Sequence, residues 1–335
     1  MKILFALITV LILSLAAFTG VEYLHMEYVF GIVIPYAAFI IFIAGFTAKI
    51  FYWAKSPVPF NITTTAGQQK SLKWIKSDHF ENPSGSFGVI GRMFMEIFFF
   101  RSLFRNTKAG LVKSSKSESF KPGYASDKSL WLGGLMFHWS FLYILIRHLR
   151  FFLYPIPSAI VTLEKFDSMF QIGLPIFYLT DAILLLSVTF LFLRRVFIPQ
   201  VKYISLIADF IPLFLILAIA FSGIMMRYVS RVDVIGVKEL VMSLTSFSPA
   251  LPEKVSSVFY VHFFLVSSLF MYFPFSKLMH MGGVFFSPTR NMTGDSRRIR
   301  HVNPWNYSVK VHSYEEYEDE FREAMKGAGL PLDKE

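Results

Sequence analysis

The sequence contains no cysteine, and this absence excludes several kinds of redox centre. Without a thiolate the chain has no cysteine ligand for an iron–sulfur cluster or a zinc ion, no disulfide, and no attachment point for a covalent c-type haem. Any haem or metal that it holds must be bound by its eight histidines, by methionine or by carboxylates.

Charged residues are also scarce, at 17% of the 335 residues, whereas 54% are hydrophobic and 18% are aromatic. Soluble domains carry about 25% charged residues. The composition therefore excludes an ordinary water-soluble globule and indicates a multi-span membrane protein. The net charge of +10 comes from basic residues gathered in particular loops, which is how membrane proteins encode their orientation, and we expect no nucleic-acid partner.

Six segments are apolar for about 18 residues or more, which is long enough to cross a bilayer. They are residues 3–20, 28–50, 130–153, 172–193, 203–226 and 258–279. We interpret the first as a retained span and not as a signal sequence, because its apolar stretch is long and lacks a good cleavage site. Residues 87–104 are apolar but contain Arg92, Glu96 and Arg101, so we interpret them as a helix in the membrane interface whose arginines reach toward water.

Lysine and arginine gather in residues 49–128, 194–202 and 290–310, three regions that the six spans place on one side of the membrane. The positive-inside rule makes that side the cytoplasm, so we predict a multi-pass protein of the cell membrane with both termini cytoplasmic. Near the C-terminus, Ser313 and Glu316 form a capping-box pattern that predicts a short helix.

Four of the eight histidines fall inside two of the predicted spans: His138 and His148 in the third, His262 and His280 in the sixth. Ionisable residues within a membrane are costly and mark function. Because the two spans run in opposite directions, we expect His148 beside His262 near the outer face and His138 beside His280 near the cytoplasmic face. Ideal helices separate the two residues of each span by about 15 and 27 Å, a mismatch that a kink at Pro274 would reduce.

Two histidines on facing helices suit the two axial positions of a haem iron, whereas zinc requires four ligands, or three and a water. We therefore predict two non-covalent haems b whose iron ligands are His138, His148, His262 and His280. Basic residues near the two pairs are candidate partners of the haem propionates, namely Arg147, Arg150, Arg227 and Lys277. The alternative reading is four hydrogen-bonded core histidines.

The two histidine intervals resemble those of the gamma subunit of respiratory nitrate reductase, a dihaem cytochrome b family with five helices, over about residues 28–281. In that family the histidine-bearing helices are the second and fifth, so residues 1–27 here are an additional N-terminal helix. The loops are similar to those of the DsrM family, the membrane subunits of sulfite-reduction-associated DsrMKJOP complexes. The similar segments are residues 61–72, 88–92, 100–108 and 301–306, and residues 283–291 are shared also with the membrane cytochrome of heterodisulfide reductase.

These resemblances imply a subunit that oxidises menaquinol and passes electrons across the membrane to a cytoplasmic, DsrK-like iron–sulfur subunit related to heterodisulfide reductase. Further membrane and outer-side subunits would complete the complex, which serves sulfur or sulfite metabolism. Two alternatives remain: the same cytochrome serving nitrate reductase or heterodisulfide reductase, and a transporter that relays protons through its intramembrane histidines and aspartates.

For the quinol site we consider Lys165, in a short outer loop, and Asp181, an acid inside the fourth predicted span. The whole chain is then predicted to have five parts. They are an extra N-terminal transmembrane helix with an outer turn (1–27), a transmembrane helix (28–50), a cytoplasmic loop with the interfacial helix (51–129), a four-helix haem-binding membrane region (130–281) and a cytoplasmic tail (282–335).

Overall fold

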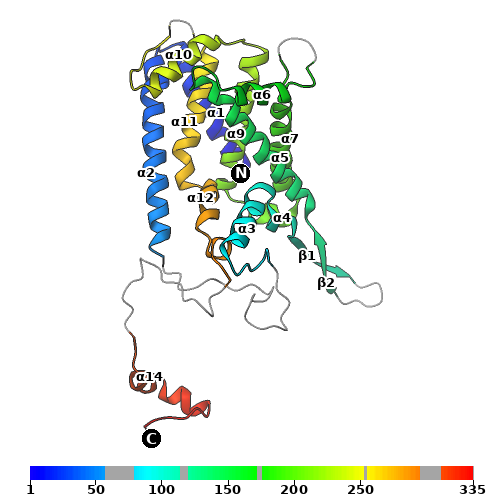
Figure 1. Cartoon of the computed structure of the whole chain (residues 1–335), viewed down its shortest axis with the longest axis vertical. Coiled ribbons are helices and arrows are strands. Elements are labelled where there is room, and N and C mark those ends of the chain that lie inside the picture. The colour runs from blue at the N-terminus through cyan, green and yellow to red at the C-terminus, as the bar shows by residue number, and fades with distance from the viewer. Residues whose placement is uncertain (57–78, 114–119, 172–175, 253–254, 295–310, 335) are drawn as a thin grey trace.

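The computed structural model describes residues 1–56, 79–113, 120–171, 176–252, 255–294 and 311–334. Long helices stand side by side and form a bundle (Figure 1). They are α1 (Lys2–Glu22), α2 (Ile34–Ala54) with the π-helical turn η1 (Val29–Val33) before it, α5 (Lys128–His148), α7 (Leu179–Phe197), α9 (Ile207–Tyr228) and α11 (Ser257–Tyr272). The predicted all-α membrane fold is confirmed.

Five of these helices are long and apolar enough to cross a membrane, and they make the chain a multi-pass membrane protein. They are Lys2–Glu22, Val29–Ala54, Lys128–Phe151, Ile207–Tyr228 and Ser257–Phe275. Between 17% and 39% of each apolar stretch is buried within the protein, so most of its surface is left for lipid.

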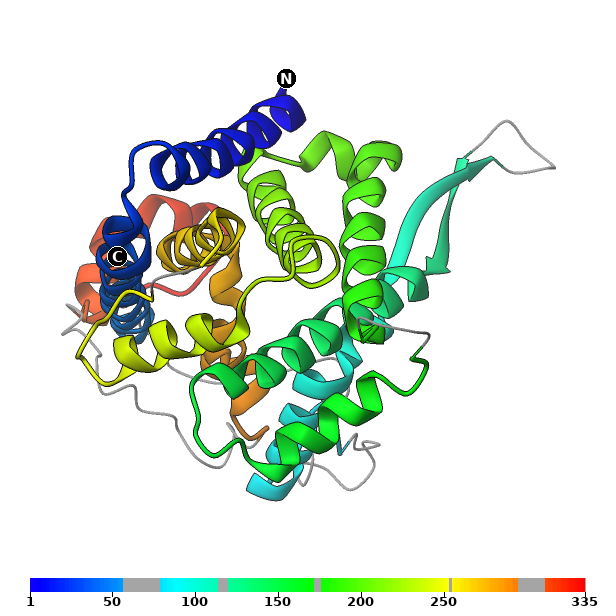
Figure 2. The ribbon, with the colours of Figure 1, turned by 90° about the horizontal axis from the view of Figure 1, so that it is seen from above.

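The fourth predicted span, residues 172–193, corresponds to α7, which begins only at Leu179. This helix has Asp181 in its first turn and Arg194 and Arg195 in its last, so it is more highly charged than the other five. It packs against both α5 and α9, and Figure 2 shows it standing in the same bundle. A total of six spans stays a prediction.

Short elements cover both ends of the bundle. At the end that contains His148 and His262, here called the His148 end, lie η2 (Leu149–Phe151), α6 (Ser158–Asp167) and α10 (Val234–Thr245). At the opposite, His138 end lie α3 (Ser86–Phe99), α4 (Arg101–Phe104), α8 (Pro199–Ile204), η3 (Phe273–Phe275), η4 (Lys277–Met279), α12 (His280–Gly283), η5 (Val284–Phe286) and α13 (Pro288–Asn291).

The predicted tail helix is confirmed as α14 (Tyr314–Gly327), with the Ser313–Glu316 capping box formed.

One feature that the sequence did not predict is an antiparallel hairpin of β1 (Thr107–Lys113) and β2 (Phe120–Ser126). Its register pairs Thr107 with Ser126 and Lys113 with Phe120. The hairpin connects α4 to α5 and extends away from the bundle (Figure 1).

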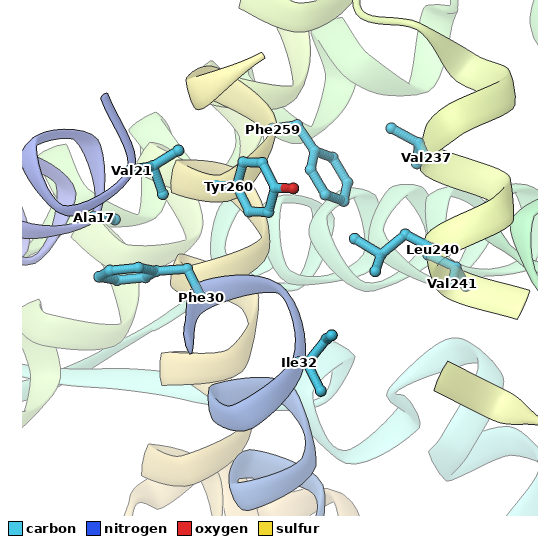
Figure 3. Packing of buried hydrophobic residues seen from close by; sticks show 9 residues of the cluster. All are labelled: Ala17, Val21, Phe30, Ile32, Val237, Leu240, Val241, Phe259 and Tyr260. Atoms are coloured by element: carbon cyan, nitrogen blue, oxygen red, sulfur yellow. The ribbon is translucent and has the colours of Figure 1, made fainter. Parts of the chain in front are cut away.

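Two buried apolar clusters hold the long helices together. The first, at the His148 end, joins α1, η1, α10 and α11 (Figure 3); it comprises Ala17, Val21, Phe30, Ile32, Val237, Leu240, Val241, Phe259 and Tyr260. The second joins α1, α7, α9 and α11 through Val10, Leu184, Val188, Leu215, Ile216, Leu265 and Leu269. Lipid tails are as apolar as these side chains, so van der Waals packing and interhelical hydrogen bonds stabilise such contacts.

The sixth predicted span is not one regular helix, which corrects its predicted course to residue 279. α11 ends at Tyr272, and Pro274, which cannot donate a backbone hydrogen bond, lies in the 3₁₀ turn that follows. Ser276 is then extended, with φ −121° and ψ 175°. His280 therefore begins the separate short helix α12 and does not continue the face of α11 that carries His262.

The helix predicted for residues 87–104 in the membrane interface also differs from its prediction. Arg92 on α3 is 3% exposed and does not reach water; it donates to the backbone oxygens of Glu81, Arg290 and Met292 at 2.7–2.9 Å. Burial and the neighbouring charge of Arg290 lower the pKa of this guanidinium. The large side chains exposed on α3 are all apolar, Phe87, Ile90, Phe94 and Phe99, whereas its charged residues Arg92 and Glu96 are turned into the protein.

Candidate functional site

The structure brings the four intramembrane histidines together in two pairs. The ring centres of His138 and His280 lie 5.9 Å apart at the His138 end, and those of His148 and His262 lie 6.5 Å apart at the other. These are the partners that antiparallel spans predict. The break after α11 accounts for the distance mismatch, since His280 approaches His138 from α12.

The separation within each pair fits a shared metal between the rings. An imidazole nitrogen binds a transition metal at about 2.0–2.1 Å and lies about 1.1 Å from its ring centre, so two axial histidines place their ring centres about 6.3 Å apart. The observed 5.9 and 6.5 Å lie on either side of that value.

Every one of the four histidines has its Nδ1 atom beside a backbone carbonyl oxygen. The acceptors are Gly134 O for His138 (2.8 Å), Ile144 O for His148 (2.7 Å), Ile219 O for His262 (3.1 Å) and Lys277 O for His280 (2.8 Å). A proton on Nδ1 that is donated to a carbonyl leaves the lone pair on Nε2, the tautomer that binds a metal. All four rings thus have the same kind of Nδ1 contact, which leaves Nε2 available as a ligand.

A cavity of about 460 Å³ lies between the histidines at the His138 end. It is lined by Glu96, Phe100, Ser102, Leu103, Asn106, Gly134, His138, His280, Val284 and Arg290. Arg290 donates to Glu96 at 2.5 Å and to the hydroxyl of Ser102. The sequence did not identify Arg290, Ser102 or Asn106 as site residues, because they reach the cavity only through the contact between the chain after α11 and the segment of α3 and α4.

At the His148 end, Arg147 is bound to two carboxylates. Its side chain is 5% exposed, and it donates to Asp167 at 2.7 Å and to Asp181 at 2.6 Å. Asp167 also accepts from the backbone nitrogen and the hydroxyl of Thr180, at 2.8 and 2.6 Å. We call Arg147, Asp167 and Asp181 the acid–arginine triad. It joins α5, α6 and α7 directly beside His148.

The other predicted propionate partners differ in whether they are already paired with a carboxylate. Arg150 is paired with Glu164 at 2.9 Å, and Lys277 with Asp209 at 2.7 Å. Arg227 lies over the ring of Tyr178, 4.3 Å from its centre, and within electrostatic reach of His148. Among the described residues, Arg227 has no carboxylate partner within ion-pair distance.

Of the two quinol-site candidates, Lys165 is exposed on α6 and lines neither of the two cavities. Asp181 lines a second, partly open cavity of about 300 Å³ at the His148 end, between α7 and α9. Its other lining residues are Phe177, Ala182, Leu185, Ile224 and Tyr228. The sequence motifs at residues 61–72 and 301–306 lie outside the described residues.

A bare metal ion has no comparable site within the described part of the chain, which contains no group of three or more histidine, aspartate and glutamate side chains placed to hold one. A haem needs only two protein ligands to its iron. A helical membrane bundle that presents paired, carbonyl-bound histidines at both ends is of the cytochrome b class.

Comparison with known proteins narrows this class to one family. Residues 86–300 match the model of the nitrate reductase gamma subunit family, and the chain belongs to it. The match includes all four histidines of the two pairs and the cavity at the His138 end.

Two archaeal proteins are similar to this chain along most of their length. A protein of Archaeoglobus fulgidus called Hdr-like menaquinol oxidoreductase cytochrome b-like subunit is 45% identical over 285 residues, covering 83% of each chain. A protein of the same description from Archaeoglobus profundus is 39% identical over 280 residues, covering 82% of this chain and 81% of its own.

Proposed function

We propose that this chain is the membrane dihaem cytochrome b subunit of a menaquinol oxidoreductase. It oxidises menaquinol and passes the electrons across the cell membrane to a cytoplasmic iron–sulfur subunit related to heterodisulfide reductase. The names of the two Archaeoglobus relatives support the substrate and the type of complex. The loop motifs that resemble the DsrM family support a DsrK-like partner, further membrane and outer-side subunits, and a role in sulfur or sulfite metabolism.

One observation carries the proposal: the four histidines meet ring to ring in two pairs, each ring with its Nδ1 beside a backbone carbonyl oxygen. Core histidines that merely satisfy their hydrogen bonds have no reason to pair ring to ring at the distance of two axial ligands. The family membership supports the same reading, since haem b is the cofactor of a cytochrome b.

Within this proposal His148 and His262 hold one haem b, and His138 and His280 hold the other. Such a group supplies one-electron transfer when bound. At the His138 end Arg290 and Ser102 line the cavity beside His138 and His280, and we propose them as propionate partners there, although Arg290 is also paired with Glu96. At the other end Arg227 is the better candidate, because Arg147 and Arg150 are already paired with acids.

The orientation is proposed from charge. The described parts of the basic regions 49–128, 194–202 and 290–310 lie toward the His138 end, and by the positive-inside rule we propose that this end is cytoplasmic and the His148 end outer. Both termini are then cytoplasmic, and the partner docks on residues 51–129 and the tail. The acidic helix α14 offers a polar surface of its own for such a contact.

The experiment is to substitute each of the four histidines by alanine and record reduced-minus-oxidised spectra of the purified variants. His148→Ala and His262→Ala should lose the same haem, and His138→Ala and His280→Ala the other. Ser222→Ala is a matched control, because this hydroxyl contacts His262 Nδ1 at 3.0 Å but is not a ligand, so it should retain both haems. Retention of all haem in every histidine variant would contradict the proposed ligands, whereas wild-type protein without haem would favour a proton-relaying transporter.

A further inference from the structure

Arg227, in the last turn of α9, is a cation that has neither a hydrogen bond nor an ion pair to any described residue. The residue is half-buried, and its nitrogen atoms are not sealed off. Within the described ranges, Arg194 Nε is the sole buried side-chain nitrogen or oxygen without a hydrogen-bond partner. A cation within a membrane-spanning helix is costly unless an anion accompanies it. Arg227 is therefore available to an anionic group that the described residues do not supply.

The face of α9 that bears Arg227 also lies against His262. Gly223 is one turn earlier on that face, and a Cβ added there would lie 3.4 Å from His262 Cε1. Arg227 follows about 6 Å further along the helix, toward the His148 end. Its charge also acts on His148, the other ring of the pair. The cation thus lies beside the site that the two rings form, and Gly223 leaves open the space next to His262.

The contact that holds Arg227 comes from Tyr178, the residue that precedes α7. Tyr178 is buried, with 3% of its surface exposed, and the Arg227 Cζ atom lies 4.3 Å from the centre of its ring. The negative face of an aromatic ring attracts a guanidinium, and most strongly where water is excluded. The backbone of Tyr178 is fixed at the same place, because its N–H donates to the hydroxyl of Tyr228 at 3.4 Å.

The same ring also contacts Arg147, but the two arginines depend on it differently. Arg147 Cζ lies 3.8 Å from the ring centre, and its guanidinium is in addition bound to Asp167 and Asp181. Loss of the ring would leave Arg147 with both carboxylates. Arg227 has no second anchor of this kind among the described residues, so its position depends on Tyr178.

We propose that Tyr178 is a positioning residue for the haem at the His148 end: its ring holds the Arg227 guanidinium in place as the partner of a propionate. The inference rests on the proposed function and deepens it by assigning the residue that keeps a cation beside this haem. A fixed positive charge favours the reduced iron, which carries one positive charge less than the oxidised iron. Tyr178 therefore raises the midpoint potential of this haem, and it does so through Arg227.

The test is a redox titration of the full-length protein in lipid nanodiscs, in which the haem at the His148 end is the one that His262→Ala lacks. Arg227→Met should lower the reduction equilibrium constant of this haem by about tenfold, or about 59 mV for one electron. Tyr178→Leu should lower the same constant by about threefold or more. Tyr178→Phe keeps the ring and should keep the wild-type potential.

The double variant shows whether Tyr178 acts through Arg227. Adding Tyr178→Leu to Arg227→Met should shift the potential no further than Arg227→Met alone. Tyr154→Leu is the matched control, because its ring lies 5.0 Å from Lys238 Nζ at the same end, whereas the charges that act most on the histidine there come from other residues. This control should keep both wild-type potentials, and the haem at the opposite end should keep its potential in every variant.

Three results would overturn the inference. An unchanged potential in Tyr178→Leu beside a shifted one in Arg227→Met would mean that Arg227 needs no ring to hold it. Additive shifts in the double variant would mean that Tyr178 acts through other contacts. A shift in Tyr178→Phe as large as that in Tyr178→Leu would assign the effect to the hydroxyl.

A further variant covers the case in which Tyr178→Leu does not accumulate as folded protein with haem. A ring-fluorinated phenylalanine at position 178 keeps the shape of the ring and weakens its attraction for a cation, so its potential should lie below that of Tyr178→Phe. Equal potentials would contradict the inference. Haem content, measured on the same samples, keeps the two hypotheses apart. Wild-type protein without haem contradicts the proposed function, whereas protein with two haems whose potentials do not respond to Tyr178→Leu contradicts only this inference.

Discussion

Replacing Arg147 by methionine should destabilise the protein strongly, because the arginine neutralises two acids that are largely removed from solvent. The side chain of Asp167 is 0% exposed, that of Asp181 is 13% exposed, and that of Arg147 itself is 5% exposed. Removing one member of a buried ion pair leaves an uncompensated charge and costs about 3–5 kcal/mol. We expect Arg147→Met to lower the free energy of unfolding by that amount, measured by denaturing-detergent titration of the protein in micelles.

Arg150→Met is the matched control from the same end of α5. Its partner Glu164 lies 2.9 Å away, but the two side chains are 32% and 16% exposed, so the pair should contribute only about 0–1 kcal/mol. Combining Arg147→Met with Asp167→Asn and Asp181→Asn removes all three charges and should recover most of the loss. The reasoning is refuted if Arg147→Met and Arg150→Met cost the same, or if the triple variant is no more stable than Arg147→Met.

Four further outcomes follow from the geometry. Electron paramagnetic resonance of the oxidised protein should show two different low-spin haem signals. The pair His148–His262, whose ring planes are 15° apart, should give a rhombic signal, and the pair His138–His280, at 86°, a strongly anisotropic one. Two identical signals would contradict these angles. Gly133→Ala should lower the free energy of unfolding by about 1–3 kcal/mol, because the added Cβ would lie 2.5 Å from the ring of Phe190. In the same assay Gly134→Ala should lower it much less, because there the added Cβ would lie 3.5 Å from its nearest neighbour, Leu103. Arg290→Ala removes a positive charge from the cavity at the His138 end and should lower the midpoint potential of one haem and not the other in a redox titration. Deleting residues 313–335 should weaken copurification of the iron–sulfur partner while haem reduction by a quinol stays unchanged; an undiminished yield of partner would remove the tail from the docking surface.

The histidine pairs could be predicted from sequence because the signal is local and physically strong. Ionisable residues are rare inside apolar spans, and opposite span directions determine which histidines meet. The helix at Ser313 was predictable for a similar reason, since a capping box depends on residues three positions apart.

The surroundings of the histidines could not be predicted, because they depend on contacts between distant segments. Arg290 meets Glu96 only when the chain after α11 folds back onto α3, and Arg92 is buried by the same contact. Residue patterns identified Asp181 as an intramembrane acid but not its pairing with Arg147. A helical wheel also cannot represent the extended residue at Ser276, which redirects the chain before His280.

The central claim, that the paired histidines hold two haems, is tested most directly by measuring haem per polypeptide in the purified wild-type protein. Acid–organic extraction followed by a pyridine haemochrome spectrum should yield two equivalents of haem b for each chain. Haem should be fully extractable, since no cysteine exists to bind it covalently. A protein that contains no haem, or haem that resists extraction, would contradict the account.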